Sequence, residues 1–185
     1  MQKIPTLFVR DESNPRLVTE MVTSGCEWVL SGEGKATRKY DGTNVRVTVR
    51  GGKCAHVEKR RNPSREEKKF GAEPGYVDAS RDDASNKWIF AAVDATDFSD
   101  WPDGAWSCEA VGPKIQGGPD GLDAGLVPFS LPSFVETHAV NNSVRTFGDL
   151  KAFLANTMIE GIVWHHSDGR MAKIKRRDFG FKWPV

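Results

Sequence analysis

The chain has 185 residues, of which 38% are hydrophobic and 28% charged, and its formal net charge is +1. The length fits a single domain over residues 1–185, and the near-neutral charge differs from the strongly basic balance of a pure DNA-binding protein. No apolar run approaches the ~20 residues of a membrane span, and the N-terminus lacks a secretory core. The three cysteines form no C-x-x-C pair, which indicates free thiols in a reducing cytoplasm.

The first clear pattern in chain order is an alternation over Thr43–Arg50. Val45, Val47 and Val49 fall on one side and polar residues on the other, which is typical of a half-buried strand. A glycine pair follows, so Lys53–Glu58 is expected to return as the second strand of a hairpin. The three valines are predicted core residues.

Two basic features flank this hairpin. Lys39 directly precedes its first strand, and the cluster Lys59–Arg61 follows its second strand. Because the ends of a hairpin lie side by side, we expect Lys39 and this cluster near one end of the same sheet.

The next elements are shorter and are separated by turn residues. Their patterns predict core positions for Trp88 and Trp164, and a helix whose Phe147, Leu150 and Leu154 share one face. The predicted elements are a buried strand over Lys87–Val93, a strand over Trp106–Val111, a helix over Thr146–Asn156, and strands over Ile159–His165 and Met171–Lys175.

The last two strands form a second predicted hairpin. It sets Glu160 on one strand against Lys173 and Lys175 on the other, and the i, i+2 spacing places both lysines on the same face. Of the adjacent His165 and His166, we expect one to be packed and one exposed. Several short strands with few helices predict an α+β fold with mainly antiparallel sheets flanked by helices, and argue against a doubly wound fold.

The tetrapeptide from Lys39 to Gly42, Lys-Tyr-Asp-Gly, gains its meaning from the downstream Glu160 and the Lys-x-Lys segment. Alone it is typical of a surface turn. A lysine nucleophile must lose its proton, so nearby cations or desolvation must lower its pKa from ~10.4. Such cations also neutralise phosphates, and a single carboxylate such as Glu160 suits a Mg²⁺ ion that keeps most of its waters.

In this order the segments resemble the active-site motifs of the covalent nucleotidyltransferases, the superfamily of ATP-dependent polynucleotide ligases and mRNA-capping enzymes. The resemblance implies that Lys39 attacks a nucleoside triphosphate and becomes a lysyl-nucleotide. It implies that Glu160 is the metal-associated acid. The implied nucleotide-binding residues are Asp41, Gly42, Asn44, either Arg60 or Arg61, Glu109 at the ribose, Phe134 rather than Phe129 stacked on the base, and Lys173 and Lys175 at the α-phosphate.

The resemblance narrows at three further segments, Lys3–Phe8, Glu109–Lys114 and Lys175–Gly180. They are similar to a compact, RNA ligase 1-like family of ATP-dependent RNA ligases from phages and bacteria. This implies a nucleotidyltransferase domain without a C-terminal OB domain, with ATP and Mg²⁺ or Mn²⁺ as cofactors. The implied partners are RNA ends carrying a 5′-phosphate and a 3′-hydroxyl.

Three alternatives remain open from the sequence. A capping-type guanylyltransferase or a minimal DNA ligase uses the same lysine chemistry. A nucleic-acid-binding domain can also retain the fold without catalysis. Arg176 and Arg177 are expected to form a solvated or RNA-facing basic tail.

Overall fold

The computed structural model describes residues 3–130, 132–137, 139–140 and 143–184. The chain divides into two compact units. Unit 1 contains Asp41–Phe129, whereas unit 2 contains Lys3–Tyr40 and the segment that begins at Ser130. The chain therefore leaves unit 2 after Tyr40 and returns to it for its last third.

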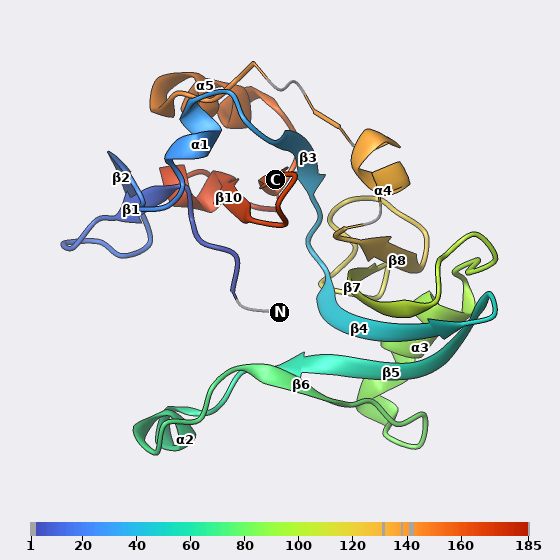
Figure 1. Cartoon of the computed structure of the whole chain (residues 1–185). Helices are drawn as coiled ribbons and strands as arrows, with labels where there is room; N and C mark the ends of the chain where they lie inside the picture. Colours follow the sequence, from blue (N-terminus) through green and yellow to red (C-terminus); the bar gives the residue numbers. More distant parts are fainter. Residues whose placement is uncertain (1–2, 131, 138, 141–142, 185) are drawn as a thin grey trace. The chain divides into compact units, whose positions relative to one another are not determined.

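Unit 1 is built on one antiparallel sheet. Its strands are β4 (Thr43–Arg50), β5 (Lys53–Arg61), β6 (Gly75–Asp78), β7 (Gly104–Val111) and β8 (Gly125–Pro128). Its helical segments are α2 (Arg65–Lys69), the 3₁₀ turn η1 (Ala84–Asn86) and α3 (Lys87–Asp94). The five strands run in the order β6-β5-β4-β7-β8 (Figure 1).

The predicted hairpin over residues 43–58 is confirmed as β4 and β5, with Val47 opposite Val57. The side chains of Val45, Val47 and Val49 are fully buried, and they pack in one core with the apolar side of α3. Since side chains alternate along a strand, the opposite face of this sheet carries the polar residues of β4 and β5.

A helix replaces the strand that we predicted over Lys87–Val93. These residues belong to α3, whose Ile89, Phe90 and Val93 are buried against the sheet at helical spacing. A short apolar run fits a buried strand or a buried helix equally well, so periodicity alone could not separate the two. The prediction that Trp88 is a core residue is also wrong, because its side chain is 41% exposed.

Unit 2 contains a second antiparallel sheet and a two-stranded ribbon. The strands are β1 (Phe8–Arg10), β2 (Val18–Val22), β3 (Lys35–Lys39), β9 (Gly161–His165) and β10 (Met171–Lys175). The helical segments are α1 (Glu27–Leu30), α4 (Pro132–Thr137), α5 (Phe147–Asn156) and the 3₁₀ turn η2 (Arg176–Phe179). The three-stranded sheet has the order β10-β9-β3. Strand β1 pairs with β2 (Figure 1).

The antiparallel pairing of both sheets and the short helices confirm the predicted α+β class. The second predicted hairpin is confirmed as β9 and β10, and Trp164 lies fully buried in the core of unit 2. The predicted common sheet of Lys39 and the cluster Lys59–Arg61 is wrong. The cluster is the end of β5, whereas Lys39 ends β3, because β3 pairs with the distant β9 instead of the adjacent hairpin.

The helix predicted over Thr146–Asn156 is confirmed as α5. The Thr146 hydroxyl oxygen accepts a hydrogen bond from the Asp149 backbone N–H at 3.2 Å, which caps the first turn. Leu150 and Leu154 are fully buried, and Phe147 packs against the same core. This helix covers the apolar face of the three-stranded sheet with the side chains that its sequence pattern predicted.

A buried arginine holds the segment that leads into β3. The Arg145 guanidinium donates to the carbonyl oxygens of Val29 at 2.6 Å, Glu33 at 2.5 Å and Gly34 at 3.0 Å. The Arg145 side chain is nearly inaccessible, and burial lowers its pKa. Its planar group carries several fixed donors, which suits the simultaneous pairing with three carbonyl oxygens.

No helix within the described ranges is long and apolar enough to cross a bilayer. Cys26, Cys54 and Cys108 are all free thiols, and burial raises the pKa of the Cys108 thiol.

We expect Arg145→Lys to lower the free energy of unfolding by about 1–3 kcal/mol, because a single ammonium group cannot replace all the hydrogen bonds of the guanidinium to the three carbonyls. Urea unfolding followed by tryptophan fluorescence measures the change. Lys151→Arg, an exchange of the same two residue types on the exposed side of α5, is the control and should leave stability unchanged. Equal midpoints for wild type and Arg145→Lys would contradict this role.

Candidate active site

One face of the unit 2 sheet gathers the lysines that the sequence singled out. In the register, Lys39 of β3 and Lys175 of β10 both lie opposite Gly161 of β9. Two residues further along β9, Val163 lies opposite both Thr37 of β3 and Lys173 of β10. Side chains two residues apart share a face, so Lys39, Lys173 and Lys175 lie on the same side of the sheet.

Glu160 neutralises part of this positive charge. Its Oε2 lies 2.5 Å from the Lys39 Nζ, and its Oε1 lies 3.9 Å from the Lys175 Nζ. The residue is only 6% exposed, so both ion pairs are shielded from water. One buried carboxylate therefore bridges the ammonium groups of two residues on β3 and β10, the strands that flank β9.

Gly161 allows the strands to meet closely at this point. A side-chain carbon at this position would overlap the Ile174 carbonyl and would lie 2.9 Å from the Lys175 Cα. Only glycine leaves room for that approach. The glycine after Glu160 therefore belongs to the geometry that holds Lys39 and Lys175 around one carboxylate.

The Lys173 ammonium group is electrostatically coupled to the rest of this cluster. Burial, followed by the charges of Lys39, Lys175 and Lys3, lowers the pKa of Lys173 to about 8, whereas Glu160 acts in the opposite direction. Crowded cations disfavour a further positive charge, and an anion placed among them would reverse that effect.

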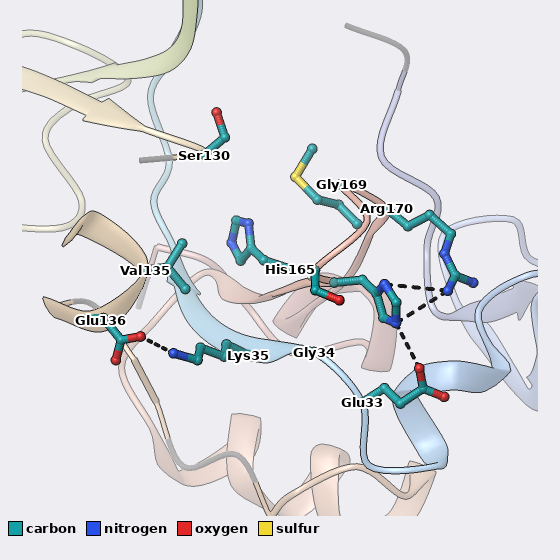
Figure 2. A pocket seen from close by; sticks show the side chains of 12 residues that line it. Glu33, Gly34, Lys35, Ser130, Val135, Glu136, His165, Gly169 and Arg170 are labelled. Carbon is teal, nitrogen blue, oxygen red and sulfur yellow. Dashed lines mark hydrogen bonds and ion pairs between the residues drawn. The ribbon is translucent and has the colours of Figure 1, made fainter. Parts of the chain in front are cut away.

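A pocket of about 670 Å³ lies at the other end of the same sheet (Figure 2). His165 lines it, and its Nε2 lies 2.9 Å from the Thr37 hydroxyl on the adjacent strand. Burial lowers the pKa of His165 to about 4, so the ring is neutral near pH 7. The Nε2 of His166 lies 2.8 Å from the Glu33 carboxylate. The expectation of one packed and one exposed histidine is wrong, because both residues are half-buried. His165 is paired with Thr37, and His166 is paired with Glu33.

The predicted stacking residue Phe134 lies half-buried in α4, a helix that contacts β3. The next two residues, Val135 and Glu136, line the pocket of Figure 2, and Glu136 forms an ion pair with Lys35. The structure therefore sets the helix of Phe134 beside the strand that ends in Lys39.

In unit 1, Gly42 and Glu109 lie in contact. The Gly42 N–H donates to the Glu109 carboxylate at 3.1 Å, and the Asp41 N–H donates to Asp120 at 2.8 Å. A side-chain carbon at Gly42 would overlap the Ala110 carbonyl. The glycine is therefore needed for this close passage beside β7.

Asn44 pairs with Glu109 across β4 and β7, so the two side chains share the polar face of the sheet. The Tyr76 hydroxyl donates to the Asn44 Oδ1 at 2.8 Å. The Arg46 guanidinium lies 4.6 Å above the Tyr76 ring. This network holds the amide of Asn44 in one orientation.

The two candidate arginines separate in the structure. Arg60 alternates with Glu58 on β5 and thus lies on the face that carries Asn44. Arg61 belongs to the other side of the strand and forms an ion pair with Glu67 of α2. Of the two, Arg60 shares a face with the other predicted nucleotide-binding residues of unit 1.

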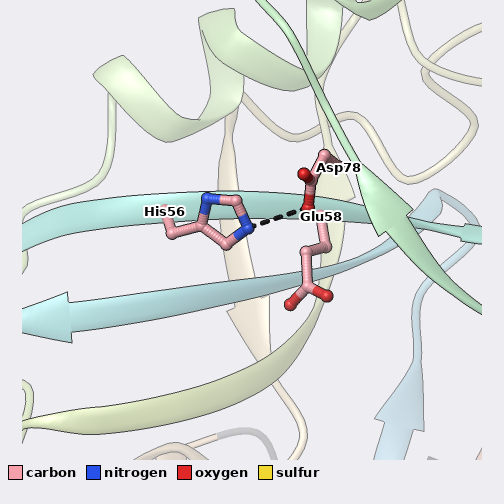
Figure 3. A group of neighbouring side chains, drawn as sticks. All are labelled: His56, Glu58 and Asp78. Carbon is pink, nitrogen blue, oxygen red and sulfur yellow. Dashed lines mark hydrogen bonds and ion pairs between the residues drawn. The ribbon is translucent and has the colours of Figure 1, made fainter.

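A second cluster on this sheet has the composition of a metal site. Ligand atoms of His56, Glu58 and Asp78 lie within 4.8 Å of one another (Figure 3). Arg46, however, donates two hydrogen bonds of 2.5 Å to the Glu58 carboxylate, and His56 pairs with Asp78 at 3.1 Å. All three side chains therefore have partners within the protein, and we describe the cluster as an ion-pair network. The metal site predicted at Glu160 is a separate place in unit 2.

Sequence reasoning missed residues that contribute to the candidate site in unit 2 and to the polar face of the unit 1 sheet. Thr37 could have been found, since it lies two residues before Lys39 on the predicted reactive side. Gly161 could have been noticed beside Glu160. The partnership of Arg46 with Tyr76 joins two strands distant in the chain and left no sequence signal.

Comparisons with known proteins agree with these motifs. Residues 104–185 match the RNA ligase 1 family. An aligned stretch of 84 residues is 32% identical to a Danio rerio protein named RNA ligase 1, and it covers 42% of this chain and 25% of that protein. The chain thus spans about a quarter of this curated relative.

Two solved structures of Naegleria gruberi RNA ligase variants are also similar. One, with AMP and Mn, has a TM-score of 0.46 and 16% identity, and the match covers 93% of this chain and 57% of that one. Another, with ATP and Mn, has a TM-score of 0.47 and 16% identity, with coverages of 94% and 58%. The sequence match over residues 104–185, which include Glu109, Glu160, Lys173 and Lys175, agrees with the predicted resemblance to RNA ligases.

Proposed function

We propose that the chain is the adenylation domain of an ATP-dependent RNA ligase, a single nucleotidyltransferase domain over residues 1–185. The observation that carries this proposal is the buried Glu160 carboxylate between Lys39 and Lys175, with Lys173 on the same face of the sheet. The family match over residues 104–185 supports it. The free cysteines suit a cytoplasmic protein.

Lys39 is the proposed nucleophile. Its Nζ attacks the α-phosphorus of ATP, a nitrogen–phosphorus bond forms, and the bond to the departing pyrophosphate breaks. The ammonium group must lose one proton before the attack and a second as the bond forms, and the Glu160 carboxylate at 2.5 Å orients the amine. Lys173 and Lys175 stabilise negative charge on the α-phosphate through their ammonium groups.

The proposed metal is Mg²⁺ or Mn²⁺, and Glu160 is the residue that would hold it. Mg²⁺ commonly binds one or two carboxylates together with substrate phosphates and water, so the single carboxylate of Glu160 fits such an ion. When bound, the metal would neutralise phosphate charge. The similar Naegleria gruberi structures contain AMP or ATP with Mn, which supports both the nucleotide and the metal.

Unit 1 supplies further proposed nucleotide contacts. Asp41 and Gly42 continue the Lys39 motif, Asn44 and Glu109 lie side by side on β4 and β7, and Arg60 shares their face. We propose that these groups bind the ribose and phosphates. Arg61 is the weaker candidate because Glu67 already binds it, and Phe134 is the proposed stacking partner of the base.

In the complete reaction, AMP passes from Lys39 to a 5′-phosphate RNA end. A 3′-hydroxyl then displaces AMP and seals the strand. Each step is an in-line displacement in which positioning and charge neutralisation lower the barrier. A guanylyltransferase would accept GTP in place of ATP, a minimal DNA ligase would prefer nicked DNA to RNA ends, and a non-catalytic domain would bind RNA without nucleotide transfer.

Incubation with ATP and magnesium should add one AMP to the wild-type protein, and peptide mass spectrometry should locate it on Lys39. Lys39→Ala should form no adduct, because the change removes the proposed nucleophilic amine, and no other residue of β3 lies opposite Gly161. Lys35→Ala, on the same strand and face, is the matched control and should be labelled normally. An adduct of equal yield on Lys39→Ala would refute the assignment, and a preference for GTP would favour the capping alternative.

Glu160→Gln should slow adenylation by about 100-fold, the scale expected when one preorganised electrostatic contact is lost at a reacting centre. The substitution keeps the shape but removes the charge that Lys39 and Lys175 share. Single-turnover labelling measures the rate. Glu136→Gln, which removes the partner of Lys35 at the far end of β3, should react like wild type. A Glu160→Gln rate within about twofold of wild type would exclude the proposed role.

AMP binding should weaken as the pH rises through about 8, the pKa of Lys173, because the ammonium group loses its proton there. Below this value Lys173 is charged and can pair with the phosphate. Titration calorimetry at several pH values gives the affinities. Lys173→Arg keeps its charge, so its affinity should stay constant over the same range. A similar decline in the arginine variant would show that another group controls binding.

A further inference from the structure

A basic groove of about 910 Å³ opens in unit 2, and Lys39 is not among its described lining residues. It is lined by two segments that are distant in the sequence, one near the N-terminus and one after β10. We define the basic groove by its cationic lining residues, which are Lys3, Arg10, Arg16, Lys175, Arg177 and Lys182. We propose that it binds the sugar–phosphate backbone of one RNA strand, which deepens the proposed function and relies on it for the choice of RNA.

The charge of the groove is almost uncompensated. Asp178 is the one acidic residue among its described lining residues, and it is only 2% exposed. The Asp178 carboxylate pairs with the Arg10 guanidinium at 2.7 Å and accepts the Lys175 backbone N–H at 2.8 Å. These contacts hold the Asp178 carboxylate in the wall of the groove, paired with groups of the protein.

The remaining cations are available to a ligand. Lys3, Arg16 and Lys182 are exposed, and none of the three forms an ion pair within the described part of the chain. Arg177 donates to the Trp183 carbonyl at 3.1 Å, which fixes its guanidinium at the groove. Several cations spread along one depression suit a polyanion with regularly spaced charges better than a single small anion.

An aromatic side chain accompanies this charge. Phe181 lines the groove and is half-buried, and the Arg176 guanidinium lies 5.8 Å from the centre of its ring. Grooves that bind single strands combine cations for the backbone with aromatic rings for the bases. The groove therefore carries both elements of single-strand recognition.

The groove also reaches the proposed active site. Lys175 lines the groove, and its Nζ lies 3.9 Å from the Glu160 carboxylate. Lys3 contributes its charge to both places, since it acts on Lys173 as well. A strand held in the groove would thus bring a terminal phosphate toward the residues that handle the α-phosphate of ATP.

The test is the affinity of a short, fluorescent, 5′-phosphorylated single-stranded RNA, measured by anisotropy over a range of salt concentrations. Combining Arg16→Ala with Lys182→Ala should weaken binding about tenfold and reduce the log–log salt slope by about 1.4, since each lost phosphate contact removes ~0.7. The matched control combines Lys53→Ala with Lys151→Ala, two exposed lysines outside the groove, and should bind like wild type. Arg16→Lys with Lys182→Arg keeps the charge and should also retain affinity.

Self-adenylation is measured on the same samples. Weaker RNA binding with normal adenylation and an unchanged melting temperature would support the groove. If wild type forms no adduct while RNA binding still depends on Arg16 and Lys182, the ligase proposal fails and the groove stands. Wild-type affinity and salt slope in the Arg16 and Lys182 variant would overturn the groove. So would intact RNA binding combined with reduced competition by inorganic pyrophosphate, which would make it a small-anion site.

Discussion

The pairing of β9 between β3 and β10 is the constraint on which the candidate site depends. Gly161 faces Lys39 on one side and Lys175 on the other, and Glu160 immediately precedes it. The hydrogen bond from Lys39 to Glu160 joins residues 121 positions apart. A shift of β9 by one residue would turn its alternate side chains to the other face, so register and charge placement cannot be separated. The close approach at Gly161 and the core under Trp164 both hold that register.

The same arrangement concentrates positive charge at the proposed site. Three ammonium groups, those of Lys39, Lys173 and Lys175, share one buried carboxylate, so positive charge remains in a partly desolvated place. Burial and the repulsion between these charges lower the pKa of Lys173 to about 8. A phosphate group would relieve the repulsion without rearranging the strands. The proposed binding of a polyphosphate and the lowered pKa of Lys173 would therefore both follow from the same arrangement of charges.

Local patterns predicted what depends on neighbouring residues. The alternation of Val45, Val47 and Val49 and the helical face of Leu150 and Leu154 lead directly to β4 and α5. The i, i+2 spacing correctly placed Lys173 and Lys175 on one face of β10, whereas Glu160 lies just before β9 and not within it. Pairing over long distances was beyond such patterns. Nothing near Lys39 indicates that β3 leaves the adjacent hairpin and pairs with β9, and the apolar run in α3 lacked a signal to separate helix from strand.

The basic segment after β10 shows how folding gives different roles to adjacent charges of the same kind. Arg176 is buried, and its guanidinium donates to the carbonyls of Leu154 and Thr157, so it fastens η2 to the end of α5. Arg177, one residue later, is exposed at the basic groove. The expectation of a solvated or RNA-facing basic tail is therefore wrong for the buried Arg176, whereas Arg177 is exposed as expected. Because Asp178 ties this turn to Arg10 and to the Lys175 backbone, the turn fixes the groove relative to Lys175. A polyanion in the groove and a nucleotide phosphate at Lys175 would thus meet one rigid segment of the chain.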